Sequence, residues 1–166
     1  PHAGVVLSEL CDPRVNSRTD RFIEIFNSGP DPVDLTNWSV VAIANGVDVC
    51  TWPLSGTLAA AQPKVCGGPS TVTGFTVHFV STVWATPAGY MNWNGNINDG
   101  AKLKNAAGTI TDLIVAPASG LFENKDLVRN ANVTVPNPVY TPSEWTATAV
   151  ILATDASPGT HNGSLP

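Results

Sequence analysis

The segment Ser39-Val40-Val41-Ala42-Ile43-Ala44-Asn45-Gly46-Val47-Asp48-Val49-Cys50-Thr51-Trp52 carries the strongest local signal in the chain. Two apolar runs rich in β-branched residues flank the pair Asn45-Gly46. Asn-Gly accepts the positive φ angles of a type I′ turn, whose twist matches that of the flanking strands. The segment therefore predicts a β-hairpin with strands at residues 39–44 and 47–52.

Two further strands are expected upstream of this hairpin. Residues 5–10 form a short apolar run, and residues 21–27 alternate strictly, with Ile23 and Ile25 on one face and Glu24 on the other. Side chains of a strand repeat every second residue, so this alternation indicates a strand whose two faces are covered unequally.

Downstream strands are expected at about residues 75–83, 101–105, 109–115 and 146–153, separated by Gly, Pro and Asn clusters. No apolar period of 3.6 residues persists long enough to predict a substantial helix. Many short strands between turns are typical of two sheets that bury their inner faces against each other. We expect an all-β antiparallel β-sandwich in a single domain, residues 1–166.

The composition limits the partners. Charged residues make up 13 % of the 166 residues, against roughly 25 % in average soluble proteins, and the formal net charge is −5. Nucleic-acid affinity depends on clustered Lys and Arg, which are few here, so we expect no nucleic-acid partner. No apolar stretch approaches the roughly 20 residues that span a bilayer, so no membrane insertion is expected.

The three cysteines, Cys11, Cys50 and Cys66, allow three different single bridges. We favour Cys50–Cys66, because closing a loop of about 15 residues is worth roughly 3 kcal/mol. Such a bridge would persist in an oxidising compartment, and Cys11 would remain a buried thiol. The alternative is three buried thiols that act as small hydrophobes.

Two sets of residues are candidates for a calcium site. The loop of residues 92–100 alternates oxygen-bearing side chains, with Asp99 as its carboxylate. Asp12, Asp31 and Asp34, with Asp20 beside them in sequence, are expected in neighbouring loops at one end of the sandwich. Turn formation by Asn and Gly explains the loop more simply, so we expect no cofactor and keep calcium as the alternative.

The sequence also lacks the patterns of common active sites. It contains no G-x-S-x-G, no H-E-x-x-H and no phosphate-binding Gly-rich loop ahead of a helix. His2, His78 and His161 lie far apart in the sequence. We therefore expect no catalytic residues and no enzyme activity.

Two motifs at the expected separation resemble a known family. Residues 22–27 read Phe-Ile-Glu-Ile-Phe-Asn, and after a Gly/Pro/Asp turn residues 33–40 read Val-Asp-Leu-Thr-Asn-Trp-Ser-Val. Residues 98–112 read Asn-Asp-Gly-Ala-Lys-Leu-Lys-Asn-Ala-Ala-Gly-Thr-Ile-Thr-Asp. Together they resemble the lamin tail domain, over about residues 5–163, with residues 67–93 matching least.

The resemblance implies an immunoglobulin-like sandwich whose motif residues are structural. It places these side chains in the core: Ile23, Ile25, Trp38, Trp52 and Leu103. It also implies an extracellular or cell-surface module that acts through contacts with proteins, surface components or copies of itself. The alternatives are a self-assembling subunit of a filament or surface layer, and an accessory domain of a larger secreted enzyme such as a nuclease or phosphatase.

Overall fold

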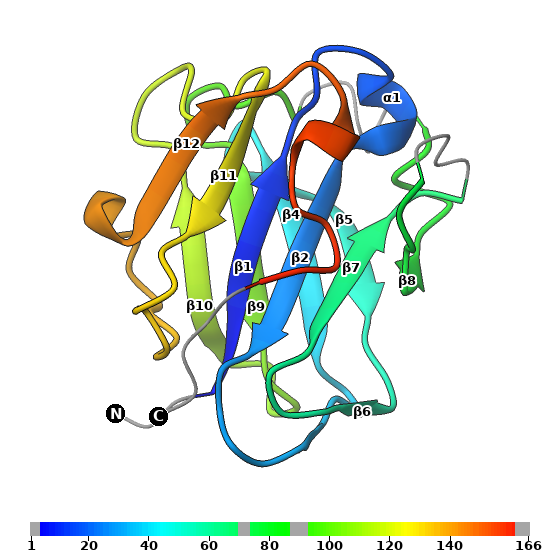
Figure 1. The fold of residues 1–166 in the computed structure, drawn as a ribbon, viewed down its shortest axis with the longest axis vertical. Coiled ribbons are helices and arrows are strands. Elements are labelled where there is room, and N and C mark those ends of the chain that lie inside the picture. The colour runs from blue at the N-terminus through cyan, green and yellow to red at the C-terminus, as the bar shows by residue number, and fades with distance from the viewer. Residues whose placement is uncertain (1–3, 70–73, 87–92, 162–166) are drawn as a thin grey trace.

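The chain folds as two facing β-sheets in a computed structural model that describes residues 4–69, 74–86 and 93–161. The larger sheet has six strands in the order β12 (Trp145–Ala149), β11 (Lys125–Arg129), β1 (Val5–Cys11), β2 (Phe22–Asn27), β7 (Pro63–Gly67) and β8 (Phe79–Val80) (Figure 1). The smaller sheet has four strands in the order β10 (Ile110–Val115), β9 (Gly100–Lys104), β4 (Ser39–Ala44) and β5 (Val47–Pro53). The remaining elements are short: the two-stranded pair β3 (Val33–Asp34) and β6 (Thr57–Leu58), helix α1 (Ser17–Asp20), and the 3-10 helices η1 (Pro142–Glu144) and η2 (Ala153–Asp155).

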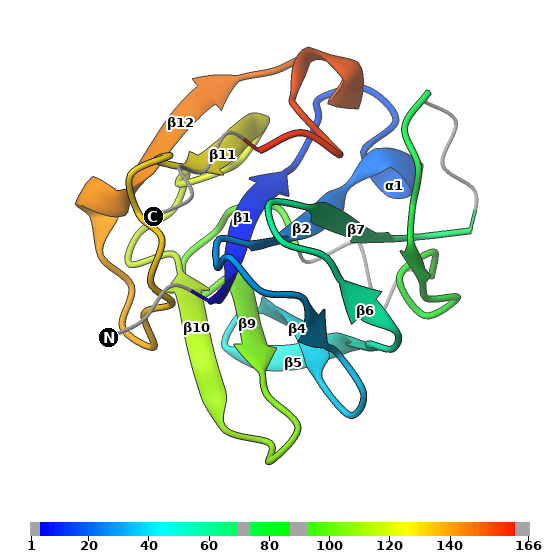
Figure 2. The ribbon, with the colours of Figure 1, turned by 60° about the horizontal axis from the view of Figure 1, so that its bottom comes forward.

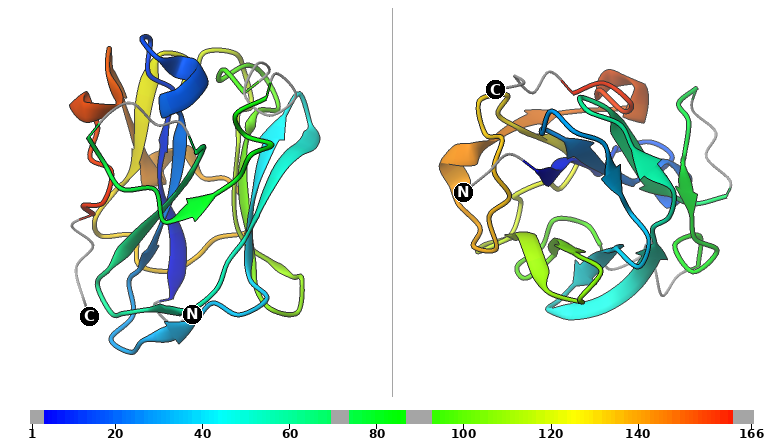
Figure 3. Two further views of the ribbon diagram at one scale, coloured as in Figure 1. Left: turned by 90° about the vertical axis from the view of Figure 1, so that its right-hand side faces the viewer. Right: turned by 90° about the horizontal axis from the view of Figure 1, so that it is seen from below.

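The two main sheets pack face to face, as Figures 2 and 3 show. Among the described strands every pairing is antiparallel except that of β7 with β8. Leu7 and Ile25 from the larger sheet and Val40 and Leu103 from the smaller one belong to one buried cluster. The fold is therefore the expected all-β, immunoglobulin-like antiparallel β-sandwich. No helix among the described residues is long and apolar enough to cross a membrane.

The predicted hairpin is confirmed as β4 and β5. Asn45 and Gly46 form its turn with φ angles of 52° and 78°, the two positive values that a type I′ turn requires. Ala44 pairs with Val47 directly beside the turn. The local sequence thus specifies the turn, and the loop before β9 supports it, because the Gly46 N–H donates to the Asn98 carbonyl at 2.9 Å.

A row of four aromatic rings fills one end of the core. Trp52 contacts Trp84 at 5.0 Å between ring centroids, Trp84 contacts Trp93 at 5.2 Å, and Trp93 contacts Phe122 at 4.6 Å. Each indole N–H donates to a backbone carbonyl at 2.8–3.0 Å, so the rings are buried without loss of a hydrogen bond. Trp84 and Trp93 lie outside any strand, in the segment of residues 67–93. Within that segment the expected strand at 75–83 is only the two-residue β8, and residues 70–73 and 87–92 lie outside the described residues.

Of the five expected core residues, Ile23, Ile25, Trp52 and Leu103 are fully buried. Trp38 is only partly buried and packs against the margin of the core, which corrects its expected place. It precedes β4 in a turn at the end of the sandwich, where its N–H donates to the Leu35 carbonyl at 3.0 Å. Leu35, rather than Trp38, is fully buried there.

Because Trp38 is only partly buried, its replacement is expected to have a moderate effect on stability. Trp38→Ala is expected to lower the free energy of unfolding by about 2 kcal/mol, below the roughly 3–5 kcal/mol of a fully buried tryptophan, because part of the ring is already in water. Urea-induced unfolding measures the difference from wild type. A loss above about 4 kcal/mol would contradict this marginal position.

The outer face of the six-stranded sheet is also covered. The chain crosses it after η2, over β1 and β2 (Figure 1). Phe22, Glu24 and Phe26, on the outer face of β2, are buried to 1 % exposure or less. Both faces of this strand are therefore covered, which corrects the unequal covering expected from its alternation.

Candidate functional site

Three carboxyl groups lie buried on the outer face of the six-stranded sheet. Glu9 on β1 pairs in register with Glu24 on β2, and Asp126 on β11 pairs with Cys11 on β1. Glu9 and Glu24 have no exposed surface and Asp126 retains 5 %. Buried carboxyl groups need partners, so the covering segment has to supply them.

Residues 153–161, here called the C-terminal strap, provide partners for Glu9 and Glu24, while Asp126 shares a side-chain hydrogen bond with Glu9. The backbone N–H and the hydroxyl of Ser157 donate to the two oxygens of Glu9 at 2.8 and 2.9 Å. The N–H of Gly159 donates to Oε2 of Glu24 at 2.7 Å, and Ser8 donates to Oε1 at 2.7 Å. The strap is thus fastened to the sheet by carboxyl groups from β1 and β2.

Burial shifts the protonation of this group. Desolvation and the nearby Glu9 raise the pKa of Glu24 to about 8. Desolvation and Glu9 raise the pKa of Asp126 to about 9, and Asp126 also shares a side-chain hydrogen bond with Glu9. Burial raises the pKa of Glu9 as well. Near neutral pH, Glu24 and Asp126 therefore hold protons, which spares the sheet a cluster of buried charges.

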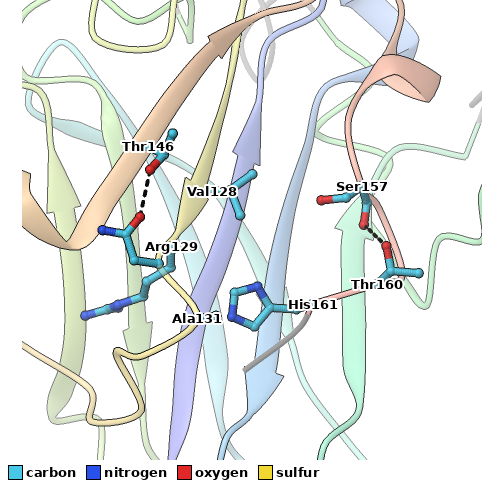
Figure 4. Close-up of a pocket in the computed structure, with 8 residues that line it drawn as sticks. Val128, Arg129, Ala131, Thr146, Ser157, Thr160 and His161 are labelled. Atoms are coloured by element: carbon cyan, nitrogen blue, oxygen red, sulfur yellow. Dashed lines mark hydrogen bonds between the residues drawn. The ribbon is translucent and has the colours of Figure 1, made fainter. Parts of the chain in front are cut away.

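A pocket of about 350 Å³ opens beside the strap (Figure 4). Val128 of β11, Asn130 just after it and Thr146 of β12 line it on one side, and Ser157 and His161 line it from the strap. The Thr146 hydroxyl donates to Oδ1 of Asn130 at 2.7 Å, and Ser157 is held by Glu9. The hydroxyl groups around the pocket thus serve contacts within the fold.

The described histidines do not meet in a site. His161 lies edge-on to the Phe26 ring at 4.7 Å, and burial together with the Arg129 charge lowers its pKa. His78 accepts the Val65 N–H at its Nδ1 at 3.1 Å. His2 lies outside the described residues. Both described histidines therefore have a structural explanation.

Arg129 joins the two sheets through a buried ion pair. Its guanidinium lies 2.5 Å from Asp112 on β10 and 2.6 Å from Glu144, and it sits over the Trp145 ring at 5.1 Å. Asp112 also accepts the Leu7 N–H at 2.7 Å. Arg129 is 1 % exposed and Asp112 is fully buried, so the pair is closed to solvent.

The residues considered for calcium do not gather. Asp12 lies 2.5 Å from Arg21 at the start of β2, whereas Asp31 and Asp34 follow the opposite end of that strand. This corrects the expectation of one shared loop cluster, because antiparallel pairing of β1 with β2 sends the two loops to opposite ends. Asp34 is exposed and accepts from Thr36. Among the described residues, no group of three or more acidic, His or Cys side chains could hold a metal ion.

Asp99 organises the described part of the loop at residues 92–100, which is residues 93–100. Its carboxylate accepts the backbone N–H groups of Asn45, Asn94 and Asn96 at 2.7–3.1 Å. At the next residue, Gly100, a Cβ atom would lie 1.9 Å from the Ile114 carbonyl oxygen. The Asp-Gly pair is therefore needed for loop closure and close strand approach, in line with the turn explanation of this loop.

All three cysteines are buried free thiols, and the bridge expected between Cys50 and Cys66 is not formed. Cys50 lies on β5 and Cys66 on β7, which belong to the two opposing sheets. The Cys50 thiol instead donates to the Ser81 hydroxyl at 3.3 Å. Burial raises the pKa of each thiol, which disfavours the reactive thiolate. Cys11 is the buried thiol expected at the end of the first strand.

Sequence reasoning did not single out Glu9, Asp126 or Arg129. The one available signal was Glu24, a carboxylate between two aromatic residues in an alternating strand. Such a position is ordinary on an open face and costly on a covered one. The covering could not be read from the strand itself.

Comparison with known proteins adds a family. A family model described as the Lamin Tail Domain matches residues 1–117. No curated protein sequence matches the chain. The matched part includes the whole four-stranded sheet and β1, β2, β7 and β8, while β11, β12 and the C-terminal strap follow it.

Proposed function

The chain belongs to the lamin tail domain family, and on that basis we propose that it is a non-catalytic module that acts by contact with proteins or cell-surface components outside the cell. The main support for this proposal is that the buried polar groups have structural roles. The Arg129–Asp112 pair, the Asp99 loop and the carboxyl groups under the C-terminal strap all hold parts of the fold together. What the chain offers to partners is its surface.

The surface carries few charges, so its contacts with partners depend little on electrostatic attraction. Charged residues are 13 % of the chain, and several of the acidic ones are buried. Large apolar side chains are exposed, including Val47, Ile97, Val139 and Ile151. A neutral surface with exposed apolar residues supports protein contact more than the binding of a charged substrate.

The extracellular location in this proposal is supported by the family match and by the low charge. The cysteines no longer contribute, because buried free thiols are compatible with either redox compartment.

A labelled preparation of the chain tests this function. It is expected to bind intact cells of its source saturably, with competition by unlabelled chain, and to give no turnover with phosphodiester or phosphomonoester substrates. The same assays on His78→Ala and His161→Ala serve as controls. Absence of saturable binding would refute the contact function, and turnover lost in either variant would refute the non-catalytic one.

A further inference from the structure

β12 is an edge strand of the six-stranded sheet. One side of it pairs with β11 in an unbroken register from Arg129–Trp145 to Lys125–Ala149. No described strand pairs with its other side (Figure 1). Alternate residues of β12 therefore turn their N–H and C=O groups outward, where another strand can bind them.

The other sheet edges carry features that oppose strand addition. β5 holds Asp48, which is paired with Lys102 at 2.6 Å, and ends in Pro53. β10 has a register shift after Ile110, and its Leu113 N–H already donates to Asn137. β8 has only two residues. Charges, prolines, bulges and short length are the usual protections of an edge.

β12 has none of these protections. Residues 146–149 read Thr-Ala-Thr-Ala, and all four are exposed. The strand contains no charged residue and no proline, and its pairing with β11 has no bulge. In a chain with a net charge of −5, a fully neutral exposed edge is one place where two copies can approach without repulsion.

We propose that β12 pairs antiparallel with β12 of a second copy of this chain, across a two-fold axis at Ala147. This arrangement places Thr146 of one copy opposite Thr148 of the other, twice. Thr–Thr pairs are favourable across antiparallel strands, so the sequence is complementary to itself. The exposed Ile151, just beyond the strand, comes near Pro142 and Ser143 before β12 in the other copy, which adds apolar contact. The inference rests on the proposed contact function and names one of its partners.

Cysteine cross-linking tests the two-fold axis. Directly opposed residues of an antiparallel pair have Cα atoms about 4.5–5.5 Å apart, which suits a disulfide. Ala147→Cys is expected to form a covalent dimer under mild oxidation on a non-reducing gel, while the native thiols are buried. Thr51→Cys, at an exposed position of the protected edge β5, is the matched control and is expected to stay monomeric. Equal cross-linking of the two variants would overturn the proposal.

Sedimentation equilibrium provides a second test without cysteine. Thr148→Lys is expected to weaken self-association at least tenfold, whereas Thr51→Lys leaves it unchanged, with circular dichroism confirming that both variants fold. Wild-type protein that stays monomeric at millimolar concentration would overturn self-pairing. If that monomer still bound cells saturably, the contact function would stand and only self-pairing would fail. A dimer that bound no cells would support self-pairing and refute the binding to cells.

Discussion

Replacing Arg129 with methionine is expected to lower the free energy of unfolding by about 3–5 kcal/mol, because it leaves a buried carboxylate without its cation. Asp112 is fully buried and keeps only N–H donors, such as that of Leu7, once the guanidinium is gone. Methionine fills much of the space of the arginine stem, so most of the loss comes from charge rather than from a cavity. Urea-induced unfolding followed by tryptophan fluorescence measures it.

Lys102→Met is the matched control for this experiment. Lys102 pairs with Asp48 at 2.6 Å, but the Asp48 side chain is 48 % exposed. Exposed pairs are worth about 0–1 kcal/mol, so the control is expected to stay within that range. The double variant Arg129→Met with Asp112→Asn is expected to recover part of the loss, because it removes the uncompensated charge. Equal effects of Arg129→Met and Lys102→Met would show that the buried pair contributes no more than a surface pair.

The contrast between these two pairs shows where sequence reasoning succeeds. Lys102 and Asp48 lie on strands that the sequence predicts from local signals, the Asn45-Gly46 turn and the motif at residues 98–112. Both hairpins occur in the structure because a few neighbouring residues determine each turn. Arg129 lies on β11, a strand with a weak local pattern, and its partner Asp112 is on the opposite sheet. No local pattern reports such a pair.

The aromatic core shows the same limit. Trp38 stands in a recognisable motif and was expected inside, yet it lies at the margin of the core. Trp84 and Trp93 lie outside any predicted or observed strand and are almost fully buried. They contact Trp52, directly or through each other, because the two sheets pack face to face. The predicted Cys50–Cys66 bridge is wrong for a similar reason. The strands β5 and β7 are close in sequence but belong to opposing sheets.

The buried carboxyl groups were out of reach for a different reason. Glu24 is covered by Gly159, which lies 135 residues further along the chain. A strand alternation reports which residues share a face but not what covers that face. The same covering gives the chain a pH dependence that its surface composition would not suggest.

The stability of the chain is expected to fall as the pH rises from about 7 to about 9, above the range in which the histidines titrate. The pKa of Glu24 is raised from 4.5 to about 8 and that of Asp126 from 3.8 to about 9, chiefly by burial. Between these limits the folded chain holds protons that the unfolded chain has lost, so folding takes up protons and a higher pH opposes it. Each such group contributes up to about 1.4 kcal/mol per pH unit. Glu9 faces both groups and burial raises its pKa as well, so Glu9 adds to the same trend.

Glu24→Gln isolates the contribution of one group. The glutamine carbonyl can still accept the Gly159 N–H, and its amide can donate to Ser8, but nothing remains to ionise. The variant is expected to lose less stability than wild type between pH 7 and pH 9 in chemical denaturation, and to keep the amides of Ser157 and Gly159 protected from hydrogen exchange at pH 9. Asp34→Asn is the control, because Asp34 is exposed and Thr36 holds its pKa below the usual value, which leaves it ionised throughout this range. A wild-type stability that is constant or rises from pH 7 to pH 9, or an identical slope in Glu24→Gln, would show that the carboxyl groups under the C-terminal strap are already ionised at neutral pH.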